Sequence, residues 1–322
     1  MEQHGAPAVS VIVPARDAAS TLPRTLAGLE RQQLDAPFEV IVVDNGSNDD
    51  TAEIAERHPL EPRVIRRRRG EGAGAARNDG VAASRGEALA FIDSDCDPTP
   101  TWLAEGLKTL SGVDLVAGAV RPPPEEPVDL FDRTLWVTRE HGLYETANLF
   151  VKREWFERLG GFQDWVPERP DLPAAAGRPF GEDVWFAWRA RRLGARTAFE
   201  PRSVVHHAVF PGTARDYVVE QWRVRHFPAL IARIPELRDV FAWHRWFLNS
   251  RTAAFDAAAV GAITAAILRS VLPLSAAAPY AVLLWRDVRT WGTRRALVTT
   301  ARDAVGSAAL VIGSVQARTP LL

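Results

Sequence analysis

Over the first 120 residues, short apolar runs alternate with segments of helical spacing, and this alternation constrains the fold more than any other feature. We expect strands at residues 9–14, 38–44, 63–66, 88–93 and 113–120. Helices are expected between them, at residues 20–33, 50–57, 73–83 and 101–110. Strands and helices that alternate at this spacing form right-handed crossovers around a largely parallel sheet. The sequence therefore predicts an α/β fold whose ligands bind beyond the carboxyl ends of the strands.

Composition excludes several classes of protein. The chain has 322 residues, of which 47% are hydrophobic and 25% charged, as in ordinary globular proteins. Its single cysteine, Cys96, excludes an internal disulfide scaffold. The 39 basic and 40 acidic side chains nearly cancel, so we expect no nucleic-acid partner. Residues 1–8 contain no apolar core of a secretory signal, which favours a cytoplasmic start.

Charge is distributed unevenly, which predicts two parts. Residues 226–322 contain 11 arginines, no lysine and 5 acidic residues, whereas residues 1–225 carry a net negative charge. Arginine-rich apolar segments that contain tryptophan suit the anionic cytoplasmic face of a membrane. We therefore expect a catalytic domain at 1–225 and a helical, membrane-associated region at 226–322. A soluble helical subdomain is the alternative.

The apolar segments of the second part are short. Residues 257–268, 270–285 and 304–317 are uncharged stretches of 12, 16 and 14 residues, below the ~18–20 that span a bilayer. A re-entrant or in-plane hairpin with Arg269 and Arg286 at its ends fits these lengths. Residues 221–246 mix aromatic and basic side chains at helical spacing and predict one interfacial amphipathic helix.

Acidic residues close two of the expected strands. Asp44 ends the second strand, and Asp93-Ser94-Asp95 follows the fourth. Two carboxylates in one loop after an apolar strand suit Mg²⁺ or Mn²⁺, which keep coordination positions for substrate phosphates. A solvated acidic turn is the alternative for this motif alone. An EF-hand is excluded, because the spaced ligands and the closing glutamate are missing.

A second acidic motif, Gly181-Glu182-Asp183, precedes a helical segment far downstream. An acidic pair after a glycine turn is common at helix starts, where it caps the helix. A carboxylate at this point can also serve as a general base if the fold brings it against the first acidic site. The motif alone leaves both interpretations open.

A glycine-rich segment at residues 70–75 raises a different hypothesis. It matches G-x-G-x-x-A, and Asp93 lies 21 residues beyond Gly72, as in dinucleotide-binding proteins. The strand before it would be charged, and a complete strand–helix–strand unit already precedes it. A phosphate loop of the Walker type is excluded, because no Gly-Lys-Ser/Thr follows. Because the glycine spacing matches, a dinucleotide-dependent oxidoreductase remains a second hypothesis.

Seven blocks in order resemble the family 2 glycosyltransferases with the GT-A fold, a Rossmann-like, mostly parallel sheet flanked by helices. The blocks lie at 11–17, 42–51, 74–80 (with Ala-Arg-Asn), 91–95 (with Asp-Ser-Asp), 147–162, 181–183 and 201–207. The resemblance covers about residues 9–225.

The resemblance implies a role for particular residues. It assigns the nucleotide and sugar of the donor to a set of substrate-binding residues: Pro14, Ala15, Arg16, Asp17, Asp44, Gly74, Arg77, Asp93, Ser94, Asp95, Asn148 and Glu182. Asp95 and His207 would hold the metal ion, with His206 as the fallback. Asp183 would be the catalytic base that takes a proton from the acceptor hydroxyl.

The resemblance also implies a reaction. A sugar would move with inversion from a nucleotide-diphosphate sugar to a hydroxyl or lipid-linked acceptor, with Mn²⁺ or Mg²⁺, in cell-envelope glycan or glycolipid synthesis. The chain departs from the family at Glu71 and Gly72, where the family often has Asn-x-Gly, and in a proline-rich loop at 164–180 that would form an acceptor lid. A non-catalytic sugar-nucleotide-binding membrane protein is the third hypothesis.

Overall fold

The computed structural model describes residues 6–163 and 181–322, so the proline-rich loop at 164–180 lies outside the described residues. The chain divides into two compact units. The first comprises Met1–Pro127 with Thr134–Val209, and the second Val128–Arg133 with Phe210–Leu322. The expected functional division after residue 225 stays a prediction.

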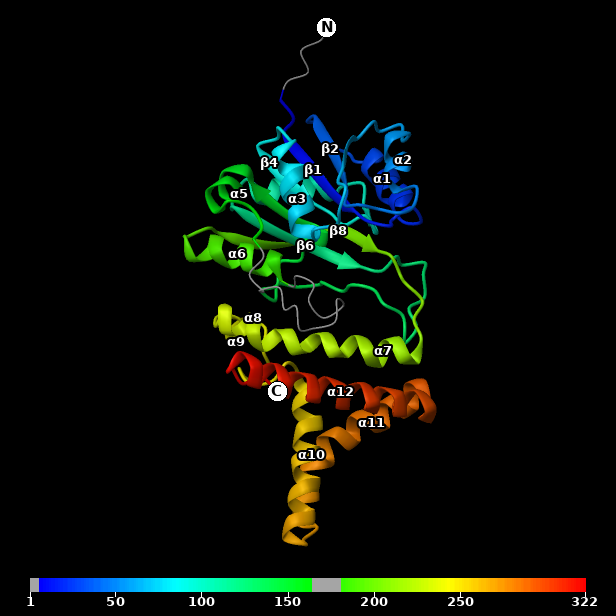
Figure 1. The fold of residues 1–322 in the computed structure, drawn as a ribbon, viewed down its shortest axis with the longest axis vertical. Helices are drawn as coiled ribbons and strands as arrows, with labels where there is room; N and C mark the ends of the chain where they lie inside the picture. Colours follow the sequence, from blue (N-terminus) through cyan, green and yellow to red (C-terminus); the bar gives the residue numbers. More distant parts are fainter. Residues whose placement is uncertain (1–5, 164–180) are drawn as a thin grey trace. The chain divides into compact units, whose positions relative to one another are not determined.

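The first unit is built on one mixed, mostly parallel sheet, which confirms the α/β prediction (Figure 1). Within the described residues the sheet has eight strands in the order β3-β2-β1-β4-β7-β6-β8-β5. Their bounds are β1 Val9–Ala15, β2 Phe38–Asp44, β3 Arg63–Arg66, β4 Ala88–Phe91, β5 Cys96–Pro98, β6 Leu115–Arg121, β7 Leu149–Lys152 and β8 Thr197–His207. The helices are α1 Leu22–Glu30, α2 Thr51–Glu56, α3 Ala73–Ala82, α4 Trp102–Leu110, η1 Thr146–Asn148, α5 Arg153–Leu159 and α6 Glu182–Arg192.

Burial explains why the apolar runs became central strands. Val9, Val11 and Val13 of β1 are fully buried and belong to one hydrophobic cluster with Leu22, Leu26 and Leu29 of α1. A strand in the middle of a parallel sheet is covered on both faces, so it carries a nearly continuous apolar run. The charged run of β3 instead lies at the edge of the sheet, where its outer residues are exposed.

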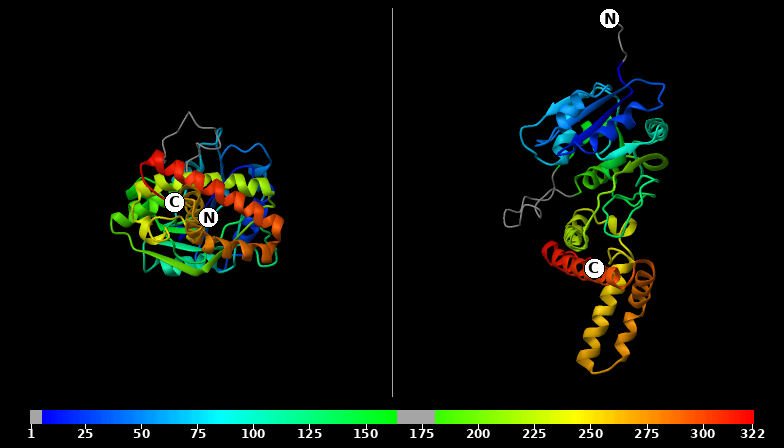
Figure 2. Two further views of the ribbon diagram at one scale, coloured as in Figure 1. Left: turned by 90° about the horizontal axis from the view of Figure 1, so that it is seen from below. Right: turned by 90° about the vertical axis from the view of Figure 1, so that its right-hand side faces the viewer.

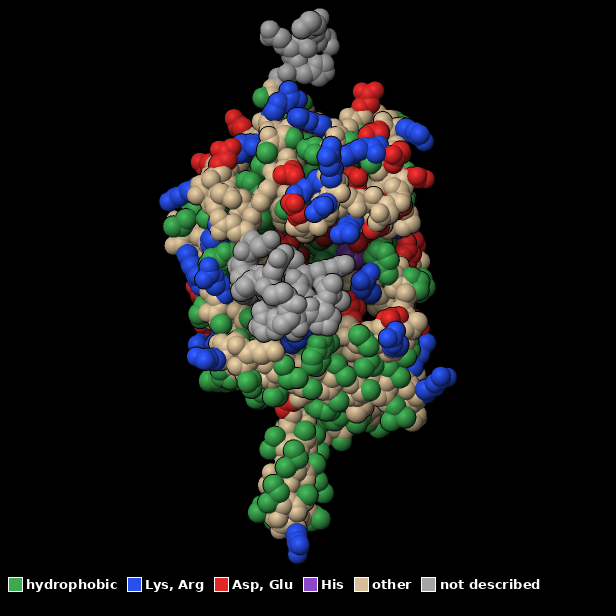
Figure 3. All heavy atoms as spheres, in the orientation of Figure 1, with side chains coloured by type: hydrophobic (Ala, Val, Ile, Leu, Met, Phe, Trp, Pro, Cys, Tyr) green, Lys and Arg blue, Asp and Glu red, His purple; other side chains and the backbone are tan. Residues whose placement is uncertain are grey.

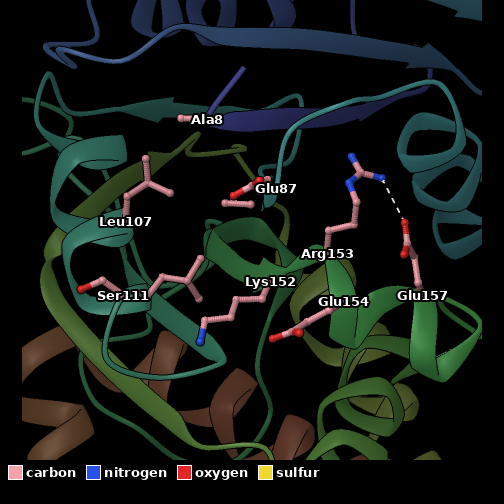
Figure 4. A pocket seen from close by; sticks show the side chains of 10 residues that line it. Ala8, Glu87, Leu107, Ser111, Lys152, Arg153, Glu154 and Glu157 are labelled. Carbon is pink, nitrogen blue, oxygen red and sulfur yellow. Dashed lines mark ion pairs between the residues drawn. The ribbon is translucent and has the colours of Figure 1, made fainter. Parts of the chain in front are cut away.

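Parallel pairing brings three strand ends to one edge. β1 is parallel to β2 and β4, with Ala15 opposite Asp44 and Ile12 opposite Phe91. The loops after β1, β2 and β4 therefore leave the sheet on the same side. At the opposite edge, where β1 and β4 begin, a pocket of about 580 Å³ is lined by Ala8, Glu87, Leu107, Lys152 and other side chains (Figure 4). This pocket is distant in the sheet from the strand ends that carry the acidic residues.

The second unit is helical (Figure 2). Its helices are α7 Ala214–Glu220, η2 Gln221–His226, α8 Phe227–Arg233, α9 Leu237–Val240, α10 Ser250–Leu268, η3 Leu272–Ala277, α11 Ala278–Trp291 and α12 Thr293–Ala317. The prediction of a single helix over residues 221–246 is wrong. The segment contains η2, α8 and α9, and the break between α8 and α9 falls at Pro235, because a proline inside a helix removes a hydrogen bond.

Two apolar helices of this unit are longer than the uncharged stretches suggested. α10 has 19 residues and α12 has 25, and both are long and apolar enough to cross a membrane, with mean hydropathies of 1.4 and 1.3. They exceed the uncharged runs because each helix continues into charged flanking residues such as Arg251 and Asp303. Counting uncharged residues therefore underestimated the length of the helices.

Candidate active site

The loops after β1 and β2 are bound to each other by short hydrogen bonds. The backbone N–H of Asp17 donates to Ser47 Oγ (2.9 Å), and the N–H of Asn48 donates to Asp17 Oδ1 (2.8 Å). Asp44 is 6% exposed and accepts the N–H of Ser47 (3.0 Å) through Oδ1. Of the four residues expected to meet the nucleotide from β1, Pro14 and Ala15 end the strand and Arg16 and Asp17 lie in this loop. The expected nucleotide-binding residues of β1 and β2 are thus brought together.

Asp95 and His207 also meet, although they are far apart in the sequence. In the antiparallel pairing of β5 with β8, Cys96 lies opposite His207. His207 Nε2 is 3.6 Å from Asp95 Oδ2, and its Nδ1 lies 2.8 Å from the carbonyl of Ala208, which orients the ring. Burial, and secondly the charge of Asp93, raise the pKa of Asp95. His206 Nδ1 instead lies 3.2 Å from the carbonyl oxygen of Pro122. The contact between Asp95 and His207 therefore favours His207 over His206 as the metal ligand.

Asp95 and His207 are the described side chains expected to hold a metal ion. Among the described residues, no three His, Cys, Asp or Glu side chains gather closely enough to hold an ion by themselves. Asp95 and His207 supply one oxygen and one nitrogen donor, and Mn²⁺ or Mg²⁺ usually keeps positions for water and substrate phosphates. The pair therefore fits an ion whose coordination is completed by a diphosphate and water, and does not fit a closed structural site.

Arg77 joins the two acidic motifs. This side chain of α3 is 5% exposed, and its Nη2 donates to Asp93 Oδ1 (2.9 Å) while Nη1 donates to Glu182 Oε1 (3.1 Å). Asp93 follows β4 and Glu182 begins α6, about 90 residues later in the chain. A buried cation between two carboxylates holds both side chains in place. Its removal is costly, because it would leave their charges without compensation. The segment 93–95 and the start of α6 consequently belong to one site.

Gly74 allows this arrangement. A Cβ atom at residue 74 would lie 3.1 Å from Glu182 Cγ and 3.4 Å from Phe162 Cβ. Contacts this close force a neighbour to move, and the nearer neighbour is the carboxylate side chain that Arg77 holds. The role of Gly74 is therefore to leave space for Glu182 at the helix start.

Asp183 occupies an environment that suits a general base. Its Oδ1 accepts the N–H of Val184 (2.8 Å), and its Oδ2 accepts the N–H of Thr146 (3.4 Å). Burial, followed by the negative charge of Glu182, raises the pKa of Asp183 to about 8, while Arg77 acts in the opposite direction. A base whose pKa lies near the working pH transfers protons efficiently.

Sequence reasoning missed Glu145 and His141. His141 Nε2 is 3.3 Å from Glu145 Oε1, and the charge of Glu145 contributes to the raised pKa of Asp183. Trp188 of α6 donates from Nε1 to the carbonyl of Gly142 (2.9 Å), which attaches this segment to the helix that carries Asp183. The i, i+4 spacing of His141 and Glu145 was visible in the sequence, but nothing there placed the pair beside α6.

The expectation that Asn148 contacts the substrate requires a correction. Its side chain is 1% exposed and bonded within the protein: Oδ1 accepts Trp102 Nε1 (2.8 Å), and Nδ2 donates to the carbonyls of Ala119 (2.9 Å) and Ser203 (2.8 Å). Because both N–H donors are used internally and the side chain is buried, Asn148 does not reach a substrate. Its position connects β6, β8 and α4 beneath the site.

The glycine-rich segment 70–75 follows the edge strand β3 and not the central strand β1. A dinucleotide fingerprint requires the turn after the first, central strand of the unit. The fold thus gives no support to a dinucleotide site at this place.

Comparison with known proteins decides the family. The model described as Glycosyl transferase family 2 matches residues 10–163. Glycosyltransferase AglE of Haloferax volcanii is 30% identical over 258 residues, covering 75% of this chain and 80% of AglE. The chain belongs to the family 2 glycosyltransferases. Putative glycosyltransferase EpsH of Bacillus subtilis is 36% identical over 215 residues, covering 63% of this chain and 61% of EpsH.

Solved structures agree in fold. A mannosyltransferase, PcManGT of Pyrobaculum calidifontis, in complex with GDP-Man and Mn²⁺, has a TM-score of 0.60 and 24% identity, covering 98% of this chain and 88% of its own. TarS 1-349 of S. aureus, in complex with UDP, has a TM-score of 0.51 and 20% identity, covering 96% of this chain and 91% of its own. Both support the GT-A fold. This glycosyltransferase is therefore an enzyme that uses a nucleotide-sugar donor.

The raised pKa of Asp183 predicts a dependence of stability on pH. Since this pKa is about 8 in the folded chain and ~3.9 in an unfolded one, folding stability falls as the pH rises from about 4 to 8. Asp183→Asn, which stays neutral, should therefore exceed the wild type in unfolding free energy above pH 8 by at least ~1 kcal/mol, and match it near pH 4. Denaturant unfolding of both proteins at pH 4 and pH 9 measures the difference, and a variant no more stable than the wild type at pH 9 would contradict the prediction.

Glu145→Gln tests the neighbouring carboxylate. Removing this negative charge should lower the pKa of Asp183, because like charges raise the pKa of a carboxyl group. The acidic limb of the pH profile of kcat/KM should then move to lower pH, while His141 remains in place. An unchanged limb would show that Glu145 and Asp183 do not interact.

Proposed function

We propose that the chain is a metal-dependent, inverting glycosyltransferase that moves a sugar from a nucleotide-diphosphate sugar to a hydroxyl group. The observation that carries the proposal is the bridge from Arg77 to Asp93 and to Glu182 (2.9 and 3.1 Å), which supports a shared site for the Asp93–Asp95 segment and the neighbouring Asp183, the proposed base. Neighbours in fold bind GDP-Man with Mn²⁺, and UDP. Their ligands support a nucleotide diphosphate here.

Each element of the site has a role in this reaction. The loops that carry Arg16, Asp17 and Asp44 would hold the base and ribose, and Asp93 the ribose. A bound Mn²⁺ or Mg²⁺ supplies Lewis-acid stabilisation of the diphosphate leaving group, and Asp95 and His207 would hold it. Asp183 would accept the proton of the acceptor hydroxyl while the acceptor oxygen attacks the anomeric carbon from the face opposite the diphosphate, which inverts the configuration.

The acceptor and cellular place form a second part of the proposal. We propose that residues 226–322 associate with the cytoplasmic face of the cell membrane, and that the acceptor is a glycan or lipid-linked molecule of the cell envelope. Two long apolar helices and the excess of arginine over acidic residues support this assignment. An acceptor that is already anionic, such as a lipid phosphate, would need little help from a base.

The decisive experiment measures transfer from labelled nucleotide sugars. The full chain is incubated with UDP- and GDP-sugars, hydroxyl and lipid-phosphate acceptors, and vesicles, with Mn²⁺ or with a chelator. We expect donor turnover that requires the metal, with an anomeric configuration in the product opposite to that of the donor. Reduction or oxidation of a nicotinamide cofactor would favour the oxidoreductase, and binding without turnover would favour the non-catalytic hypothesis.

Ligand binding gives a prediction that does not depend on the acceptor. A nucleotide diphosphate with Mn²⁺ at 100 times its Kd should add ~2.7 kcal/mol of stability, which is a rise of several degrees in Tm. In Asp95→Asn the part of the rise that depends on Mn²⁺ should be lost. A thermal-shift panel of nucleoside diphosphates, with metal and with chelator, measures this, and no shift with any of them would count against the proposal.

A further inference from the structure

Apolar side chains gather on the surface of the second unit (Figure 3). They form two surfaces, which we call the hairpin and the outer stripe. The hairpin is residues 257–285, made by α10, η3 and the first half of α11. The outer stripe lies on α12, which runs across the base of the hairpin and not along it (Figures 1 and 2).

The hairpin exposes its apolar side chains while closing on itself. Ile267, Val271 and Leu272 near its tip are 74%, 78% and 80% exposed. Gly261 of α10 lets the other arm approach closely, because a Cβ there would lie 2.6 Å from the carbonyl of Pro273. The two arms of the hairpin are therefore in close contact at Gly261, and the large apolar side chains near the tip are exposed. Exposed apolar side chains that gather in this way indicate a surface that contacts a membrane or another apolar partner.

The base of the hairpin contains an ion-pair cluster around Arg251. Arg251 donates from Nε to Asp303 (2.8 Å) and from Nη2 to Asp287 (2.7 Å). Ser307 Oγ donates to Asp256 (2.6 Å) on α10. From Asp256 to Arg269 at the tip, the helix rises by ~20 Å without another charged residue. This length matches a large part of the ~30 Å hydrocarbon core of a bilayer.

α12 differs from the hairpin because one of its faces is packed against protein. Ala309 and Leu310 are fully buried, and Gly313 brings the helix against η2, where a Cβ would lie 2.1 Å from the carbonyl of Arg225. The opposite face carries uncharged, exposed residues at a spacing of three to four, which form the outer stripe: Leu297, Ala301, Ala304, Ala308, Val311 and Val315. A helix that packs on protein with one face and exposes an apolar stripe on the other fits a position in the plane of a membrane interface.

Arginine and tryptophan surround the level of α12. Arg286, Arg289 and Arg294 are exposed, as are Trp285 and Trp291, and Arg289 lies over the ring of Trp285 at 4.5 Å. Tryptophan is enriched at the boundary between headgroups and acyl chains, and arginine pairs there with lipid phosphates. These residues define where the headgroups should lie relative to the second unit.

We propose that the hairpin is embedded in a lipid bilayer and that α12 lies flat in the headgroup region, with its outer stripe against the acyl chains. The proposal deepens the membrane association of the proposed function and rests on it. It divides two helices of similar hydropathy into one inserted and one in-plane element. Arg269 at the tip then extends its side chain toward polar groups, as arginines at helix ends do.

Depth measurements on the full chain test the arrangement. Nitroxide labels are placed through Ile267→Cys in the hairpin, Ala308→Cys in the outer stripe and Ser111→Cys on the first unit. The native Cys96 is fully buried, and the unsubstituted chain controls for its labelling. In vesicles of equimolar phosphatidylcholine and phosphatidylglycerol, collision with oxygen and with a water-soluble nickel complex should place residue 267 deepest, residue 308 at the headgroup boundary and residue 111 in water.

The outcomes separate the proposal from its alternatives. A label at 267 that is as accessible to nickel as the label at 111 would overturn insertion, and one at 308 as deep as at 267 would overturn the in-plane position. These readouts need no sugar transfer, so a failure of the proposed reaction would leave them unchanged.

A charge substitution provides a second measurement. Ile267→Glu should lower partitioning into the same vesicles by on the order of 100-fold, because a charged residue in the hydrocarbon costs that much in binding. Ile267→Ala removes most of the apolar side chain without adding a charge and should retain most of the binding. Circular dichroism of both variants confirms folding, and equal partitioning of the glutamate and alanine variants would overturn the proposal.

Discussion

Asp183→Asn is expected to lower kcat/KM for a hydroxyl acceptor by about 10²–10⁴-fold, the contribution of a positioned proton acceptor. The substitution keeps the shorter hydrogen bond, from Val184 to Oδ1 (2.8 Å), because an amide oxygen also accepts it, and loses only the long one from Thr146 to Oδ2 (3.4 Å). Donor binding, measured by thermal shift, should therefore be preserved while turnover is lost. Steady-state kinetics with a saturating donor measure the effect.

The pH profile supports the same assignment. With a pKa of about 8 for Asp183, kcat/KM of the wild type should rise about tenfold per pH unit up to that value and then level off. This limb should be missing in Asp183→Asn. Asp50→Asn is the matched control, since Asp50 precedes α2 without a capping hydrogen bond from its side chain and should leave the profile intact. A loss below threefold in Asp183→Asn would reject the hydroxyl acceptor and favour one that is already ionised.

The sequence predicted the central part of the fold well, because buried parallel strands require unbroken apolar runs. β2 and β3 have the expected bounds, and β1 differs by one residue. Asp44 and Asp93 could be placed at one edge for the same reason, since parallel strands share the side at which they end. These inferences needed only local pattern and the rules of parallel pairing.

Other features of the site depend on contacts between distant segments. Arg77 could be named as part of a family block, but its double contact with Asp93 and Glu182 arises only when α6 packs beside α3. The effect of Glu145 on the pKa of Asp183 could not be predicted for the same reason. It depends on the hydrogen bond by which Trp188 holds the neighbouring segment against α6. Asn148 was assigned to the substrate although its side chain is used inside the core, since sequence pattern does not reveal burial of a polar group.

Arg77→Leu is expected to lower the unfolding free energy by about 3–5 kcal/mol, the cost of removing one partner from a buried ionic cluster. The guanidinium is 5% exposed and is bonded to Asp93 and Glu182, and its charge also lowers the pKa of Asp183. Without it, Asp93, Glu182 and Asp183 would lose the cation that offsets their negative charge. Denaturant unfolding at pH 7 measures the loss.

Arg66→Leu is the matched control, because Arg66 also bridges two carboxylates, Glu53 and Glu56, but its side chain is 48% exposed. Water screens such pairs, so this variant should lose far less stability than Arg77→Leu. Arg77→Lys should fall between them, since an ammonium keeps the charge but cannot bond two carboxylates with the planar geometry of a guanidinium. The loss in Arg77→Leu should shrink at pH 5, where more of the carboxyl groups are protonated. If Arg66→Leu and Arg77→Leu lowered the unfolding free energy equally, independent of pH, the bridge from Arg77 would contribute no more stability than a surface ion pair.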